Sequence, residues 1–283
     1  MERALRRIGP RRETGRAVHE ARRSLKRARA DLRLGRAAFG AAVVHRENSA
    51  CRRAARMLAP ARDADVFAAS VGRILQRRRR VLTSAQYSSG RLLAAAARRE
   101  ALRALADEVV RGRAFGLLRG CRDRLAACAL APAGRPALEA QARRALARAV
   151  TAWRGVRAAP SAATYHGLRK AVQRLRYSLE WLSPAGREAA ARISDLHELS
   201  DALGEEHDLA EFRRRLAGRP FNPSARDLRR FARIRQVRLR ERALRLGRGL
   251  FERSSQSLSS AFSVSCLTES KASRDSTIRR MLA

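Results

Sequence analysis

The segment HEARRSLKRARADL at residues 19–32 aligns without a gap on HGLRKAVQRLRYSL at residues 166–179. Each segment begins with a histidine and repeats basic residues at the same positions. The matched residues are His19 with His166, Arg22 with Arg169, Arg23 with Lys170, Arg27 with Arg174, Arg29 with Arg176, and Leu32 with Leu179. Recurrence at a fixed offset indicates a repeated structural unit.

A second repeat follows the first at nearly the same offset. The segment LAPARDADVF at residues 58–67 lies over LGEEHDLAEF at residues 203–212. Because two pairs of segments match in the same order, we infer an internal duplication. We expect one half at residues 1–131 and the other at residues 137–253, related by a pseudo-twofold axis. The Pro- and Gly-containing stretch at residues 131–136, APAGRP, is the expected linker between them.

The composition favours helices throughout the chain. Aromatic residues make up only 5% of it, and Ala, Leu and Arg, which are good helix formers, are abundant. We therefore predict an all-α protein with helices at residues 16–46, 48–58, 63–80, 90–111, 114–130, 137–158, 161–183, 186–203, 208–217 and 224–252. Pro60 is expected to stop the second helix and Asp63 to cap the third. The Ser-rich tail, residues 254–283, is expected to be poorly ordered or loosely docked.

Each repeated basic segment predicts a helix with two chemically different faces. At about 100° per residue, Leu168, Val172 and Leu175 fall on the side opposite His166, and the basic residues occupy the front. Cations at this spacing repel one another, and the nearest acids in the sequence are too few to neutralise them. A bound polyanion would relieve the repulsion. A solvated basic face, or pairing with acids from another helix, is the alternative explanation.

The charge of the whole chain points to the same class of partner. Lys and Arg number 63 against 26 acidic residues, which gives a formal net charge of +37. All of the basic residues except Lys26, Lys170 and Lys271 are arginines. A field of this strength attracts polyanions, and the planar guanidinium group suits phosphate oxygens.

These motifs carry a resemblance to a known family. The pattern His-x-x-Arg-x-x-x-[Arg/Lys]-Arg-x-Arg begins at His19 and, with Gln173 in place of one cation, at His166. Together with RDADV at residues 62–66 and LRYSLE at residues 175–180, it resembles the CHAD domain, the conserved-histidine α-helical domain. The resemblance implies two pseudo-symmetric four-helix bundles around a central basic cavity. It also implies polyphosphate binding and association with polyphosphate granules.

The resemblance also names the expected phosphate ligands, which are the histidines and cations of the two motifs. They are His19, Arg22, Lys26, Arg27, Arg29, His166, Arg169, Arg174 and Arg176. Gln173 stands where the second motif normally has a cation. Its amide still donates hydrogen bonds, and we expect the neighbouring Arg23 and Lys170 to compensate for the missing charge.

Other residue patterns argue against catalysis and metal binding. We expect Asp63, Asp65 and Asp208 to cap helices and hold arginines in place, not to bind a metal. The sequence shows neither a Ser/His/Asp or Cys/His nucleophile system nor a Walker-type phosphate loop, so we predict no catalysis and no cofactor. Four scattered cysteines favour reduced thiols in a cytoplasmic protein. No window reaches the ~18 apolar residues of a membrane-spanning helix.

Inorganic polyphosphate is the leading candidate for the partner because it is a continuous line of negative charge without bases. The main alternative is a DNA- or RNA-binding protein. The basic charge permits it, but proteins that bind single strands use aromatic stacking platforms, and these helices carry almost none. A further alternative is an accessory subunit of a polyphosphate- or triphosphate-processing enzyme. An enzyme itself would need carboxylates clustered among the basic residues to hold Mg²⁺, and the sequence shows no such cluster.

Overall fold

The computed structural model describes residues 1–8, 15–131, 135–182, 187–218 and 223–253. Within these residues the regular structure is entirely helical. The helices are α1 (Glu2–Ile8), α2 (Gly15–Leu34), α3 (Arg36–Phe39), α4 (Ala41–Met57), α5 (Ala59–Arg77), α6 (Ser84–Ala106), α7 (Glu108–Ala126), α8 (Arg135–Ala158), α9 (Ala162–Leu182), α10 (Arg187–Ala217), α11 (Pro223–Arg248) and the π-helical turn η1 (Gly249–Arg253). None of the helices in these ranges combines the length and apolar character needed to cross a membrane.

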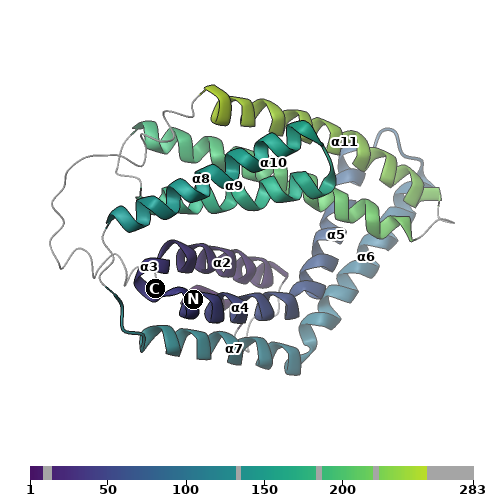
Figure 1. The fold of residues 1–283 in the computed structure, drawn as a ribbon. Coiled ribbons are helices and arrows are strands. Elements are labelled where there is room, and N and C mark those ends of the chain that lie inside the picture. Colours follow the sequence, from purple (N-terminus) through teal and green to yellow (C-terminus); the bar gives the residue numbers. More distant parts are fainter. Residues whose placement is uncertain (9–14, 132–134, 183–186, 219–222, 254–283) are drawn as a thin grey trace.

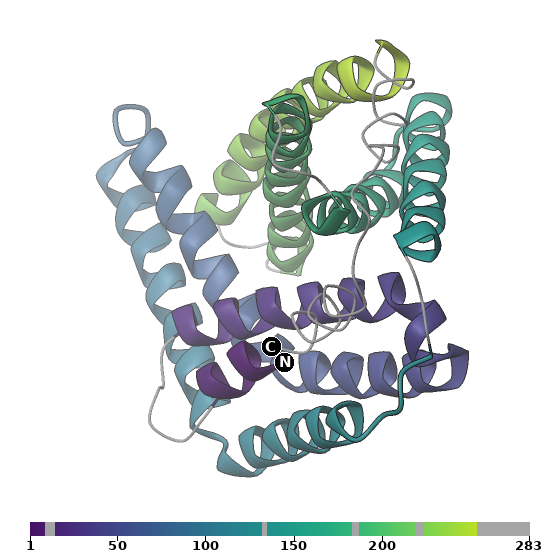
Figure 2. The same cartoon turned by 90° about the vertical axis from the view of Figure 1, so that its left-hand side faces the viewer.

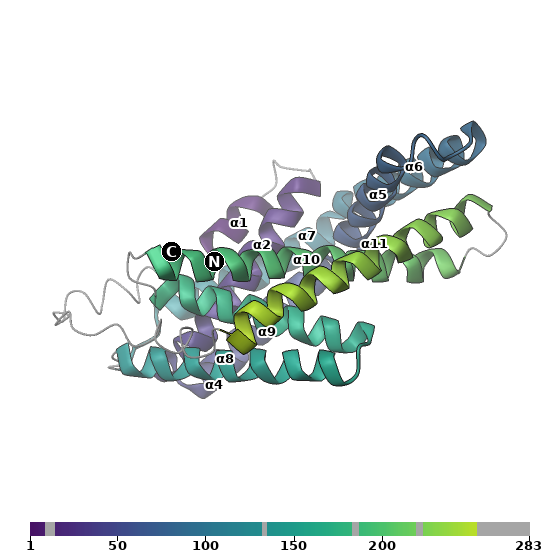
Figure 3. The ribbon, with the colours of Figure 1, turned by 90° about the horizontal axis from the view of Figure 1, so that it is seen from above.

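The helices form two groups that a pair of helices connects. Figure 1 shows α2, α4 and α7 in one group, and α8 to α11 in the other. The antiparallel pair α5 and α6 runs beside both groups (Figure 2), with α5 packed on α2 and α10 and α6 packed on α11. Figure 3 shows the far ends of α5 and α6 beside the start of α11. The two groups therefore meet where α2 faces α9, and α5 joins them by packing on both α2 and α10.

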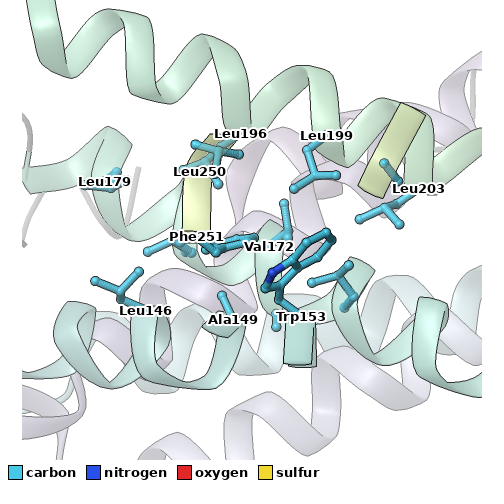
Figure 4. Packing of buried hydrophobic residues seen from close by; sticks show 14 of the residues in the cluster. Leu146, Ala149, Trp153, Val172, Leu179, Leu196, Leu199, Leu203, Leu250 and Phe251 are labelled. Atoms are coloured by element: carbon cyan, nitrogen blue, oxygen red, sulfur yellow. The ribbon is translucent and has the colours of Figure 1, made fainter. Parts of the chain in front are cut away.

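The group formed by α8 to α11 has its own hydrophobic core (Figure 4). Leu199 and Leu203 of α10 pack there with Trp153 of α8, whose ring centroid lies 6.1 Å from that of Phe251. Leu34 of α2 also belongs to this core. Burial of each large apolar side chain contributes about 1.5–3 kcal/mol relative to exposure, so this core fixes α9 and its basic face against α8 and α10.

Two further cores hold the rest of the described chain together. One joins α1, α2, α4 and α7, and the other joins α5 and α6 to α10 and α11. The second of these contains Phe67 and Phe212, whose ring centroids are 5.1 Å apart. These two phenylalanines occupy equivalent positions in the second sequence repeat. Segments that match in sequence therefore contact each other directly in space.

The predicted single helix at residues 16–46 is wrong, because the chain changes direction twice within it. Helix α2 ends before Gly35, and α4 begins after Gly40. Gly40 has a φ of 79°, a conformation that glycine adopts at little cost. A Cβ atom on Gly35 would come within 2.8 Å of the Phe39 ring. Both breaks depend on glycines, which helical periodicity alone does not locate.

The expected helix caps at Asp63 and Asp208 are also wrong. Helix α5 begins at Ala59 and includes Pro60 in its first turn, where proline is tolerated because its missing N–H has no helical partner. Asp63 therefore lies inside α5. Helix α10 runs unbroken from Arg187 to Ala217, although we predicted a break between residues 203 and 208. Asp208 consequently lies in the interior of a long helix.

Other predicted features fall at element boundaries or outside the described residues. The tail, residues 254–283, lies outside them, as do residues 132–134 of the expected linker. Helix α8 begins at Arg135, inside that linker. Helices α6 and α7 are separated by Asp107, whose carboxylate accepts a hydrogen bond from the Val110 amide at 2.9 Å, as is typical of an N-cap.

Two glycine substitutions test the packing. A Cβ atom on Gly247 of α11 would come within 2.4 Å of the buried Trp153 ring, so Gly247→Ala should lower the free energy of unfolding by about 1–3 kcal/mol through overpacking. Gly116 of α7 has open space around it, so Gly116→Ala should raise that free energy by about 0.5–1 kcal/mol. Urea unfolding followed by circular dichroism would measure both. Equal effects of the two variants would contradict the close packing of Gly247 against the Trp153 ring.

Candidate anion-binding cavity

A cavity of about 770 Å³ lies between α2, α5, α9 and α10. The two basic repeats provide one part of its wall, and the helices that carry the second repeat, α5 and α10, provide the other. Seven of the twelve expected polyphosphate ligands line it, namely His19, Arg22, Arg23, Lys26, Arg169, Gln173 and Arg176. The cavity thus brings together residues from both repeats that are more than a hundred positions apart in the sequence.

Helix α2 contributes its cations from a single face. Arg22 donates a hydrogen bond to the carbonyl oxygen of Ala55 on α4, which fixes its guanidinium at the cavity wall. Burial, together with Arg169 and Arg22, lowers the pKa of Lys26 to about 8. Partial desolvation, followed by the charge of Arg62, lowers the pKa of His19 at the rim. Each group would thus bind its proton more tightly if an anion entered the cavity.

Helix α9 contributes Arg169, Gln173 and Arg176. Burial, and then Arg62, lowers the pKa of Arg169, although Asp208 opposes the shift. The Nε atom of Arg169 is buried and has no hydrogen-bond partner among the described residues. A buried donor without a partner is costly, so this guanidinium has unused capacity to bind an acceptor such as a phosphate oxygen.

The five other expected ligands lie outside the cavity lining. Arg27 pairs with Glu180 at 2.9 Å, and Arg29 donates to Asn48 at 3.0 Å. Lys170 is exposed. Arg174 and His166 are half-buried and are also absent from the lining. The two motifs therefore do not present all of their basic residues to one space.

His166 lies behind a second histidine. Its ring stacks on that of His207 with 4.5 Å between centroids, and its Nδ1 atom is buried without a hydrogen-bond partner among the described residues. Burial, followed by the charge of Arg169, lowers the pKa of His207 to about 4, and burial also lowers the pKa of His166. Both imidazoles are thus held neutral near pH 7, and His207 separates His166 from the cavity.

Carboxylates also line the cavity, which the sequence reading missed. Asp63 of α5 and Asp208 of α10 are both in the lining, whereas the half-buried Asp65 is not. Asp208 lies 4.0 Å from Arg62 and caps no helix. Burial raises the pKa of Asp63 despite the nearby Arg22. In total, ten cationic and five carboxylate side chains among the described residues line the cavity, which leaves it strongly positive.

The spacing along α10 contains the signal for these acids. Asp201, Asp208 and Glu211 recur at intervals of seven and three residues, so they share one side of a continuous helix. The predicted break before residue 208 concealed this pattern. Within the described residues, no group of three or more His, Cys, Asp or Glu side chains could hold a metal ion. The arrangement therefore favours ionic and hydrogen-bonded contact with an anion.

Comparison with known proteins identifies a family. The sequence model of a protein family described as the CHAD domain matches residues 2–217, a range that runs from α1 to the end of α10 and contains every residue of the cavity lining. No curated protein matches the chain.

The His166–His207 stack predicts a pH dependence of stability. Because burial depresses the pKa of His207, the unfolded chain takes up a proton between about pH 6.5 and about pH 4 that the folded chain does not. Stability from this residue is present above pH 6.5 and is lost as the pH falls through that window. In His207→Phe, the free energy of unfolding should therefore change less steeply with pH in this window. The reduction in slope should correspond to a fraction of one proton taken up on unfolding.

Urea unfolding at a series of pH values would measure these slopes. The control is His45→Asn, which alters an exposed histidine of α4 outside the cavity and should keep the slope of the parent. An unchanged slope in His207→Phe would show that the folded protein does not keep this imidazole neutral.

Proposed function

Because the chain belongs to the CHAD domain family, we propose that it binds inorganic polyphosphate in the cavity between α2, α5, α9 and α10. The observation that carries this proposal is the approach of Arg22, Lys26 and Arg169 to one another from two helices, each with its pKa lowered by burial and by neighbouring cations. A bound polyanion supplies the counter-charge that these residues lack. The proposal assigns binding and no catalytic step.

The proposed architecture is a pair of pseudo-symmetric four-helix bundles, residues 1–131 and 137–253, with this cavity between them. Contacts between equivalent residues support it, because such contacts are expected at a twofold axis. Arg22 is close enough to its equivalent, Arg169, to lower its own pKa further, and Phe67 packs on its equivalent, Phe212. The axis would pass between these two pairs and through the cavity.

A bound polyphosphate chain would neutralise the cationic side chains that the carboxylates of the cavity neutralise only in part. Arg22 and Arg169 would face each other across the chain, and Gln173 would donate its amide hydrogens beside them. The carboxylates of α10 would stay paired with arginines of α5 and α11, as Glu205 is with Arg77 and Arg235. Because the interaction is mainly electrostatic, it should weaken as salt is added.

Nucleic acid is the main alternative partner, and the aromatic residues of the cavity disfavour it. Tyr177 lies under the guanidinium of Arg176 at 4.8 Å, and Phe67 lies under that of Arg215 at 4.7 Å. These rings are therefore occupied by arginines and are not open platforms on which bases could stack. A polyanion without bases fits this lining better. The proposed location at polyphosphate granules rests on the family resemblance alone.

The proposal predicts a selective loss of polyphosphate binding. The parent should bind polyphosphate clearly more tightly than length-matched single-stranded DNA at physiological salt. Arg22→Glu combined with Arg169→Glu should weaken polyphosphate binding by more than about tenfold and remove the preference. The slope of log affinity against log salt concentration is negative, and its magnitude should decrease by about two because two phosphate contacts are lost. Fluorescence anisotropy with labelled polymers would measure both.

The matched control is Arg99→Glu combined with Arg103→Glu, which makes the same change of net charge on the exposed side of α6. This variant should keep the preference for polyphosphate, and circular dichroism should show that both double variants remain folded. Equal affinity of the parent for the two polymers would instead favour a nucleic-acid-binding protein.

A further inference from the structure

The duplicated helices differ in charge at one pair of equivalent positions. Continuing the first alignment by one residue places Arg33 of α2 on Glu180 of α9. Every cationic position before it in the first motif aligns with a basic residue or Gln173 in the second. The reversal from acid to base therefore occurs at the end of two otherwise similar helices.

Glu180, near the C-terminal end of α9, neutralises one cation from α2 and one from α9. It lies 2.9 Å from Arg27 of α2 and 3.4 Å from Arg176, one turn before it on α9. Arg27 and Arg176 also lie over the ring of Tyr177. At this end, therefore, one carboxylate compensates both arginines that the motifs bring together.

Arg33 is the residue of α2 equivalent to Glu180 of α9, and it repels the cations around it. The equivalents of Arg27 and Arg176 are Arg174 and Arg29. After burial itself, the charges of these two residues lower the pKa of Arg33 most. Asn48 of α4 accepts hydrogen bonds from Arg29 at 3.0 Å and from Arg33 at 2.8 Å. A neutral amide thus holds two guanidinium groups close together without cancelling their charge.

Two more arginines complete this cluster from other helices. Arg52 of α4 and Arg148 of α8 also lower the pKa of Arg33, which falls to about 10 and leaves the residue cationic at neutral pH. None of the five arginines forms an ion pair with a carboxylate of the described residues. Arg29, Arg33 and Arg174 are half-buried, and Arg52 and Arg148 are exposed. An anion could therefore reach them.

We propose that Arg29, Arg33, Arg52, Arg148 and Arg174 form a second phosphate-binding site outside the cavity. The site is the duplicated counterpart of the Arg27–Glu180–Arg176 ion pairs. Glu180 neutralises the arginines there, whereas its equivalent, Arg33, adds a positive charge, so a bound anion would supply the missing counter-charge. Its ligand is a phosphate group of a polyanion, bound through several guanidinium forks from α2, α4, α8 and α9.

The site extends the cavity in one direction, and this part of the inference rests on the proposed function. Arg22, Lys26, Arg29 and Arg33 follow one another at intervals of four, three and four residues, so they lie along one side of α2. At 1.5 Å per residue, Arg22 and Arg33 are about 16 Å apart along the helix axis. A long polyphosphate could therefore occupy both sites, whereas a short one would occupy the cavity alone.

Charge reversal at Arg33 tests the second site. It removes the hydrogen bond from Arg33 to Asn48, but it places a carboxylate beside Arg29 and Arg174. Arg33→Glu recreates the pairing seen at Glu180, so it should preserve or raise the melting temperature. It should weaken binding of long-chain polyphosphate by about tenfold at low salt, and change binding of tripolyphosphate by less than about twofold because the cavity is intact. Isothermal titration calorimetry with both polymers would measure these affinities.

Two control variants sharpen the test. Arg99→Glu makes the same charge change on α6 and should leave both affinities within about twofold of the parent. Glu180→Arg opens the equivalent end, so it should lower the melting temperature without ligand and strengthen binding of the long chain. Equal losses with Arg33→Glu and Arg99→Glu would overturn the second site, since a general loss of charge would then explain the result.

A separate readout distinguishes failure of this site from failure of the cavity. In the Arg22→Glu/Arg169→Glu background, residual binding of long-chain polyphosphate should fall further when Arg33→Glu is added. If that residual binding is unchanged, the second site is wrong and the cavity proposal stands. If the parent binds neither polymer, the proposed function fails, and the second site stands only if inorganic phosphate raises the melting temperature of the parent but not of Arg33→Glu.

Discussion

Arg22 and Arg169 approach each other across the cavity, and Lys26 and Arg62 add two more positive charges beside them. In a partly desolvated space, like charges at short range raise the free energy of the folded state by several times what they would cost in water. The fold tolerates this because the backs of the same helices are apolar. Leu25 of α2 and Leu168 and Leu175 of α9 are almost completely buried, so hydrophobic packing holds the cationic faces where repulsion would separate them.

The distribution of acids follows from the same constraint. Glu47 is fully buried and is bound by both Arg124 and Arg46. Burial raises the pKa of Glu47, but the hydrogen bonds from these two arginines outweigh it and lower the pKa to about 2. Elsewhere acids pair with arginines of neighbouring helices, as Glu206 does with Arg240 at 2.8 Å. Among the described residues, several of the carboxylates thus hold neighbouring helices together. The basic repeats receive only part of this compensation, and that shortage concentrates positive potential in the cavity and around Arg33.

Much of the fold and part of the candidate site could be predicted from the sequence. The all-helical class and the family follow from composition and from the two motifs, because a pattern of apolar and basic faces survives in each copy. The helix boundaries could not be predicted as well. Gly35 and Gly40 end helices through a local ring contact and a positive φ, and Pro60 was expected to stop a helix that it instead begins. These outcomes depend on backbone geometry that neighbouring residues decide.

The site was predicted less completely than the fold, for a geometric reason. A helical wheel places Arg22, Lys26 and Arg29 on one face of α2, but it does not show which neighbouring helix each of them contacts. In the structure Lys26 lines the cavity, whereas Arg29 donates a hydrogen bond to Asn48 of α4. Asp208 was assigned a structural role, but Asp201 and Glu211 on the same side of α10 were missed, because a break was expected in a helix that is continuous.

A structure of the chain with tripolyphosphate bound would test the account most directly. We expect phosphate density between α2 and α9, with oxygens within hydrogen-bond distance of the Arg22 and Arg169 guanidinium groups. Phosphate bound instead on the outer arginines of α7 or α11, with the cavity holding only water, would contradict it. Cationic surface alone would then explain the attraction for polyanions, and the duplicated motifs would have no part in it.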